Sequence, residues 1–212
     1  MKSSDTIRVF IAAPLPPETI QRLLAPVDEL KTVCQAEGLD AAWSRPEGWH
    51  LTLKFLGPVA SDQVALLIER LPACAARHAP FAVHFTGFGV FPTARRPRVL
   101  WIGVEADEGA ASLGTLANEI DELTAALGHP SEERPFSPHL TVARIRTSLR
   151  HKPQGAAPRS SQALTQWLEG HGIGRGADRL ATMKVEQVTL MRSDSQPGGA
   201  VYTPVAVFPL SH

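Results

Sequence analysis

The sequence is poor in cysteine, has no long apolar run and has no excess of either charge. Two cysteines, Cys34 and Cys74, lack the Cys-x-x-Cys spacing of metal or redox sites, which favours buried reduced thiols over a disulfide framework. Lys plus Arg and Asp plus Glu number 21 each. The resulting formal net charge of zero argues against a protein that coats nucleic acid with a broad basic surface, but permits a local positive pocket.

Segments typical of membrane insertion or secretion are also missing. No apolar run approaches the ~20 residues of a membrane span. The N-terminal apolar stretch is short and soon meets Pro14, unlike a signal peptide. We therefore expect a cytoplasmic protein that makes no membrane contact.

The spacing of apolar and turn residues predicts an α+β fold, because hairpins are too frequent for a parallel, doubly wound sheet. Pro26 within the first helix predicts a kink or a late helix start. From Thr147 to Ala181, glycine, proline and basic residues predict an exposed excursion interrupted by one short helix near 161–169. The other expected elements are strands over 6–13, 50–57, 82–91, 97–106, 136–146, 184–194 and 200–210, and helices over 20–37, 61–71 and 110–127.

One short motif occurs twice, each time on an expected strand. HLTLKFLG begins at His50 and HLTVARIR begins at His139. Residues i and i+2 of a strand point to the same face, so His50 projects beside Thr52 and His139 beside Thr141. With 8 histidines in the chain, one His-x-Thr by chance is roughly a coin toss, whereas two copies of the longer string are not plausibly accidental. We infer two related lobes that offer the same strand to a shared cleft.

Two imidazoles and two hydroxyls in one cleft suit phosphoryl chemistry. A hydroxyl can donate to a phosphate oxygen without adding charge. Histidine titrates near neutrality, so one imidazole can take a proton from water while the other protonates a leaving oxygen in line. This chemistry needs no metal. The alternative is that the pairs merely fill positions on a sheet surface.

The chain resembles the two-histidine phosphoesterase superfamily and, within it, the LigT-like RNA 2′,3′-cyclic phosphodiesterases. The resemblance rests on RVFIAAPLP, WHLTLKFLG, GVFPTARRPRVLWIGV, PHLTVAR and LMRSDSQPGGAVYTPVAVFPL. It implies one bilobal α+β domain over 1–212, with two mostly antiparallel sheets facing a central cleft and helices outside. It also implies hydrolysis of the cyclic phosphate to a 2′-phosphomonoester without a cofactor.

The resemblance implies roles for individual residues. His50 would be the proton donor to the 3′ oxygen and His139 the proton acceptor from water, while Thr52, Thr141 and Arg144 would hold the phosphate. The residues alone do not tell which histidine is acid and which is base. Ideal strand parity puts Arg144 on the face opposite His139, so the strand must end or bulge near Ala143 for that arginine to reach phosphate.

Other substrate contacts are possible. Lys54 has the same parity as His50 and could touch the substrate, or it could be a solvated lysine at the strand end. Phe136 and Tyr202 could stack on a nucleobase. Phe55 and Leu56 are expected in the core. The basic residues of the excursion could contact RNA or form a solvated loop: Arg150, His151, Lys152, Arg159, Arg175 and Arg179.

Three other functions compete with hydrolysis. A zinc site is disfavoured because neither motif has an acidic residue at i+2, and threonine is a poor zinc ligand. A nucleotide sensor would not require two titratable groups. A 2′,5′ RNA ligase would use the same residues in reverse, but water favours hydrolysis. We expect a monomer without metal that acts on RNA 3′ ends with a cyclic phosphate or on small cyclic nucleotides.

Overall fold

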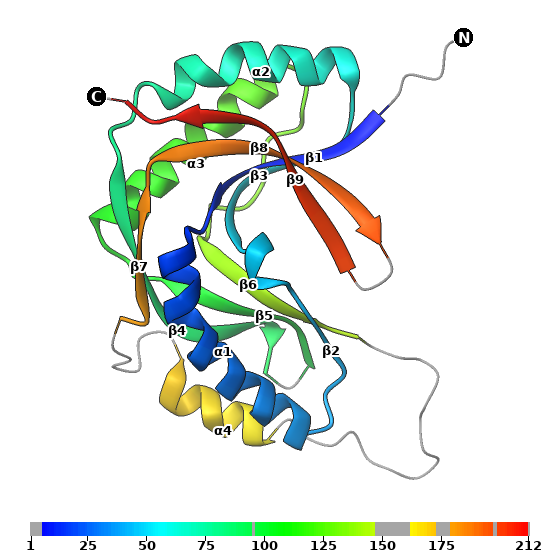
Figure 1. Cartoon of the computed structure of the whole chain (residues 1–212), viewed down its shortest axis with the longest axis vertical. Helices are drawn as coiled ribbons and strands as arrows, with labels where there is room; N and C mark the ends of the chain where they lie inside the picture. Colours follow the sequence, from blue (N-terminus) through cyan, green and yellow to red (C-terminus); the bar gives the residue numbers. More distant parts are fainter. Residues whose placement is uncertain (1–5, 95, 147–161, 173–178, 197–198, 212) are drawn as a thin grey trace.

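Two antiparallel sheets flanked by helices make up the fold, as expected for the α+β class (Figure 1). The computed structural model describes residues 6–94, 96–146, 162–172, 179–196 and 199–211. Sheet A has the strand order β3-β1-β8-β9 and sheet B the order β2-β6-β5-β4-β7. The strands are β1 (Thr6–Pro14), β2 (Ala41–Trp43), β3 (His50–Ala60), β4 (Phe81–Thr93), β5 (Arg96–Val104), β6 (His139–Ile145), β7 (Ala181–Val185), β8 (Gln187–Gln196) and β9 (Gly199–Pro209).

Helices cover the sheets from outside. Helix α2 contacts β3, β8 and β9 of sheet A, and α3 packs on α2 and reaches β3 and β4. Helix α1 contacts β7 and α4, and α4 also contacts β4, so this pair covers sheet B. The helix α1 runs through Pro26, so the alternative of a late start is wrong. The helices are α1 (Pro17–Ala36), η1 (Pro46–Gly48), α2 (Ser61–Ala75), α3 (Glu108–Ala126) and α4 (Gln162–His171).

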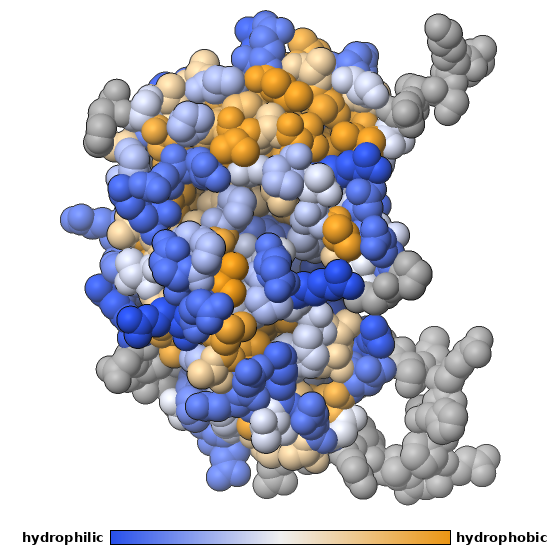
Figure 2. Space-filling view, in the orientation of Figure 1, coloured by the Kyte–Doolittle hydropathy of each residue, from blue (hydrophilic) through white to orange (hydrophobic). Residues whose placement is uncertain are grey.

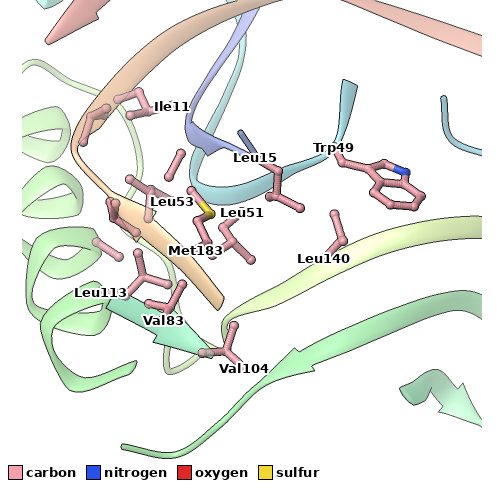
Figure 3. Packing of buried hydrophobic residues seen from close by; sticks show 14 of the residues in the cluster. Ile11, Leu15, Trp49, Leu51, Leu53, Val83, Val104, Leu113, Leu140 and Met183 are labelled. Atoms are coloured by element: carbon pink, nitrogen blue, oxygen red, sulfur yellow. The ribbon is translucent and has the colours of Figure 1, made fainter. Parts of the chain in front are cut away.

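One main core spans both sheets. Leu51 and Leu53 of β3 point toward Leu140 of β6, Leu113 of α3 and Met183 of β7 (Figure 3). Each of these side chains is at least nine-tenths buried, and burial of one such side chain contributes about 1.5–3 kcal/mol. Because this core anchors the apolar positions of β3 and β6, the intervening positions of both strands face the opposite way.

Two sequence expectations for the second half of the chain were wrong. The stretch 184–194 is two strands, because β7 pairs with β4 in sheet B whereas β8 pairs with β1 in sheet A. The short helix expected near 161–169 is present as α4, but its Leu164 is fully buried and its Trp167 packs edge-on against Phe88 at 4.9 Å. This helix is therefore packed rather than exposed, because its apolar residues cover sheet B. Residues 147–161 and 173–178 lie outside the described residues.

The face shown in Figure 2 is mostly hydrophilic, and its broadest apolar patch lies over β9 and beside α2 in the upper part of the view. Val207 of β9 and Ile68 of α2 are among the exposed large hydrophobic residues. Within the described ranges, no helix has both the length and the apolar character that crossing a membrane requires.

Candidate functional site

Strands β3 and β6, which begin at His50 and His139, contact each other although they belong to different sheets. The Nδ1 of His50 lies 2.7 Å from the carbonyl oxygen of Gly48, and the Nδ1 of His139 lies 2.8 Å from that of Ser137. A carbonyl oxygen only accepts, so both Nδ1 atoms must carry the proton in these bonds. In each ring Nε2 is therefore the nitrogen that could exchange a proton with a ligand.

The environment of His50 disfavours its charged form. Burial lowers the pKa of His50, the bond to the Gly48 carbonyl raises it, and the positive charge of His139 lowers it, with a net lowering. The effect of His139 indicates that the two imidazoles are close enough to interact electrostatically. A bound phosphate would offset both lowering effects, because its negative charge stabilises an imidazolium.

A bulge in β3 changes which side chains join His50. The register with β1 skips Leu53, so Leu53 and Lys54 both face the core. After this extra residue, Phe55 returns to the face of Thr52 and is 62% exposed. The expectation that Phe55 lies in the core was wrong because strand alternation breaks at the bulge.

The same bulge occurs in β6. The register with β5 skips Val142, so Val142 and Ala143 are both buried. Arg144 is exposed on the face that carries His139 and Thr141. The sequence predicted that Arg144 could reach phosphate only if the strand ended or bulged near Ala143, and the strand does bulge there. The first seven residues of β3 and all of β6 have identical burial patterns. The repeated sequence motif is therefore also a repeated local structure, a strand with a bulge at the same position.

Lys54 does not contact the site, contrary to the parity argument. Its side chain is only 2% exposed and lies on the core face. Lys54 Nζ donates to Asp121 Oδ1 at 2.5 Å and to the Pro130 carbonyl at 2.6 Å, with Glu132 at 3.7 Å. The lysine therefore ties β3 to α3 and to the segment after it, which is a structural role.

Aromatic rings surround His50 on sheet A. The centroid of Phe10 lies 4.8 Å from that of His50, and Tyr202 meets His50 edge-on at 5.0 Å. Phe10, Ala12 and Met191 form a small second cluster on this face, with Tyr202 packed against it. Tyr202 thus lies beside the histidine, as a wall of the site. Its expected stacking on a nucleobase stays a prediction.

Aromatic rings also surround His139 on sheet B, and the sequence reasoning did not identify them. Phe91 lies 5.4 Å from His139 and Trp101 lies 6.0 Å from it, both with steeply inclined rings. Phe91 stacks on Trp101 at 4.9 Å with an interplanar angle of 26°. Gly89 makes this possible, because a Cβ there would lie 2.2 Å from the indole ring. The signal in the sequence was the string GVFP followed by RVLWIG.

A hydrogen-bond network joins the two halves of the site. Trp49 Nε1, just before β3, donates to Ser44 Oγ at 3.0 Å. Ser44 Oγ lies 2.9 Å from the Val142 carbonyl and 3.1 Å from the Thr141 carbonyl, and Ser44 N donates to the Val142 carbonyl at 2.9 Å. These are the carbonyls that the bulge of β6 displaces. Ser44 therefore holds the bulge of β6, after which Arg144 lies on the same face as His139.

Two other expected contacts have neighbours in the fold. Phe136 is partly buried against the main core, and its stacking on a nucleobase stays a prediction. Arg179, one of the basic residues of the excursion, pairs with Glu105 at 2.6 Å. The remaining basic residues named for RNA contact lie outside the described part of the chain.

A cluster of possible metal ligands lies between α2 and α3, away from the paired histidines. Ligand atoms of Cys74, His78 and Glu119 lie within 4.8 Å of one another. The carboxylate of Glu119 already accepts from Arg77 at 2.6 Å and lies 3.2 Å from His78. Burial raises the pKa of the Cys74 thiol, which disfavours the thiolate that metals prefer. This cluster is therefore best described as an ion-pair network. Cys34 and Cys74 are free and buried, as expected.

Known proteins resemble this chain over most of its length. A family model described as the 2′-5′ RNA ligase superfamily matches residues 16–197. An RNA 2′,3′-cyclic phosphodiesterase of Aquifex aeolicus is 42% identical over 168 residues, covering 78% of this chain and 80% of the relative. A protein of the same name from Archaeoglobus fulgidus is 32% identical over 95% of this chain and 99% of its own. The solved structure of E. coli LigT complexed with 3′-AMP shares the fold, with a TM-score of 0.67 and 23% identity over 98% of this chain and 100% of that one.

Proposed function

Since this chain belongs to the 2′-5′ RNA ligase superfamily, we propose that it hydrolyses the 2′,3′-cyclic phosphate at RNA 3′ ends to a 2′-phosphomonoester. The observation that carries the proposal is the pair of imidazoles whose Nδ1 atoms are both engaged by carbonyls. Both Nε2 atoms remain for proton transfer, one to water and one to the leaving oxygen. Hydroxyls of Thr52 and Thr141 lie on the same faces and suit the non-bridging oxygens.

The residues that follow each bulge distinguish the two histidines. Phe55 shares its face with His50 and offers an exposed ring on which the terminal nucleobase can stack. The nucleoside and its 3′ oxygen would then lie beside His50, which acts as the proton donor. Arg144 shares its face with His139 and offers a guanidinium for phosphate. His139 would then take the proton from the attacking water.

The test is turnover of adenosine 2′,3′-cyclic phosphate in the presence of EDTA. The chain should release the 2′-phosphate with chelator present, and His50→Ala and His139→Ala should each lose at least ~100-fold in kcat. His171→Ala is the matched control, because this exposed histidine lies on α4 and stacks on Trp167. Loss of activity with EDTA would indicate a metal enzyme. Binding without ring opening would indicate a nucleotide sensor.

A substrate with sulfur in place of the bridging 3′ oxygen tests the assignment of acid and base. A thiolate leaves without a proton, because thiols ionise near pH 8.5, far below alcohols. His50→Ala should therefore recover most of its lost activity on the sulfur substrate, whereas His139→Ala should not. The opposite pattern would reverse the two roles. Cytoplasmic location and a monomeric state stay predictions.

A further inference from the structure

Sheet B offers a second aromatic surface on the same face as His139. Strand pairing sets Phe91 opposite Val99, and Val99 opposite Arg144, in one row across β4, β5 and β6. The next row contains Thr141 opposite Trp101. Phe91 rests one ring face on Trp101 yet remains 38% exposed. The row thus places an open aromatic ring two strands away from the proposed phosphate-binding arginine.

The terminal nucleotide of the substrate makes no use of the Phe91 ring. Under the proposed function, its base stacks on Phe55 of sheet A, beside the leaving oxygen. Phe91 lies beside His139, on the side from which water enters. A mononucleotide has a single base, so a second exposed ring in the site fits a substrate with a second base.

The charge beyond Phe91 points to the same substrate. Arg96 and Arg98 are exposed on β5, just past the row that contains Phe91. The chain as a whole has no net charge, so this local basic rim is not part of a general basic surface. Aromatic platforms followed by cationic side chains are the usual means of holding a single strand by its bases and phosphates.

We propose that Phe91, supported by Trp101, binds the penultimate base of an RNA 3′ end, so that the site prefers oligonucleotide ends to cyclic mononucleotides. This inference rests on the proposed function and adds to it a second nucleotide subsite. Gly89 contributes indirectly, because it lets the indole of Trp101 lie flat beneath the ring of Phe91.

The test compares kcat/KM for adenosine 2′,3′-cyclic phosphate and for the dinucleotide ApA with a 2′,3′-cyclic phosphate. Stacking of one base corresponds to a preference for the dinucleotide of about 10-fold. Phe91→Ala should abolish this preference, and Phe91→Trp should keep it. Any loss that Phe91→Ala causes through its contact with His139 falls on both substrates and cancels in the ratio.

Two controls identify the origin of the preference. A dinucleotide whose penultimate position is abasic should be processed by the unaltered chain no better than the mononucleotide. Phe55→Ala should slow both substrates alike and leave the ratio intact. A preference that survives either Phe91→Ala or removal of the penultimate base would overturn the stacking subsite in favour of phosphate contacts alone.

Failure of the subsite and failure of the proposed function give different results. If both substrates are opened equally well, the subsite is wrong and the phosphodiesterase stands. If neither is opened, the proposed function is wrong. Calorimetric binding of 2′-AMP and of ApA 2′-phosphate still tests the subsite in that case, because equal affinities would contradict it and about 10-fold tighter binding of the dinucleotide would support it.

Discussion

The buried pair of Lys54 and Asp121 should stabilise the fold and have little part in catalysis. Removal of one member of a buried ion pair typically costs about 3–5 kcal/mol, because the other charge is left without a partner. In Asp121→Asn, Lys54 still donates to the Pro130 carbonyl and has Glu132 at 3.7 Å, so we expect a loss at or just below this range, about 2–3 kcal/mol. Lys54→Met should cost less, about 1 kcal/mol, because Asp121 is 21% exposed and can be hydrated.

Urea unfolding of the two single variants and the double variant measures the coupling between these residues. The double variant should be about as stable as Lys54→Met alone, because asparagine then replaces a carboxylate that no longer has its lysine. Additive losses, within about 0.5 kcal/mol, would refute the pairing. Turnover supplies the second readout. Lys54→Met should keep kcat/KM within about 3-fold, whereas removal of a group that binds the reacting phosphate should cost about 100-fold or more.

The acid dependence of this pair has a definite sign. Burial raises the pKa of Asp121, but hydrogen bonds from Lys54 and from the Glu132 N–H outweigh it, and the net pKa is lowered. A carboxylate with a lowered pKa contributes stability above its unfolded pKa, about 3.9, and that stability is lost as the pH falls through the folded value. The stability difference between the unaltered chain and Asp121→Asn should therefore shrink below about pH 4.

Three further perturbations test the geometry of the site. Ser44→Ala removes the hydroxyl bonded to the bulge carbonyls ahead of Arg144, so kcat/KM should fall about 3- to 10-fold, mainly through KM, and Ser44→Thr should restore it. Gly89→Ala drives a methyl group into the ring of Trp101, so the free energy of unfolding should fall by about 1–3 kcal/mol in urea titrations. NMR titration should give His50 a pKa below that of an exposed histidine, and inorganic phosphate should raise it; a pKa that phosphate lowers would contradict the site.

Sequence patterns predicted the parts of the fold that depend on local periodicity. Alternation of apolar residues located β3 and β6. It also predicted that His50 and His139 each lie on the face of their strand that points away from the core. It failed after Thr52, because a bulge adds a residue without leaving a mark in the pattern of apolar side chains. The string from Leu51 to Phe55 fits an unbroken strand equally well, and only pairing with β1 decides between the two.

The order of strands in the sheets could not be derived from the sequence either. Residues 184–194 have the sequence pattern of a single strand. The chain nevertheless passes from sheet B to sheet A at Glu186, whose carbonyl accepts a hydrogen bond from the backbone N–H of Leu210. That crossing depends on partners distant in sequence. The same holds for Trp101 and Phe91, whose apolar character predicts burial, whereas pairing across β4, β5 and β6 sets them beside a histidine.

The repeated motif is nearly symmetric in shape and asymmetric in chemistry. Both copies place three side chains on one face: the histidine, the threonine two positions later and, after the bulge, the residue five positions after the histidine. That last residue is Phe55 in the first copy and Arg144 in the second. Under the proposed function, the direction of proton transfer would depend on how the substrate lies between the two histidines. An aromatic ring on one side and a guanidinium on the other would orient the nucleoside and its phosphate oppositely, and this difference would make His50 the acid.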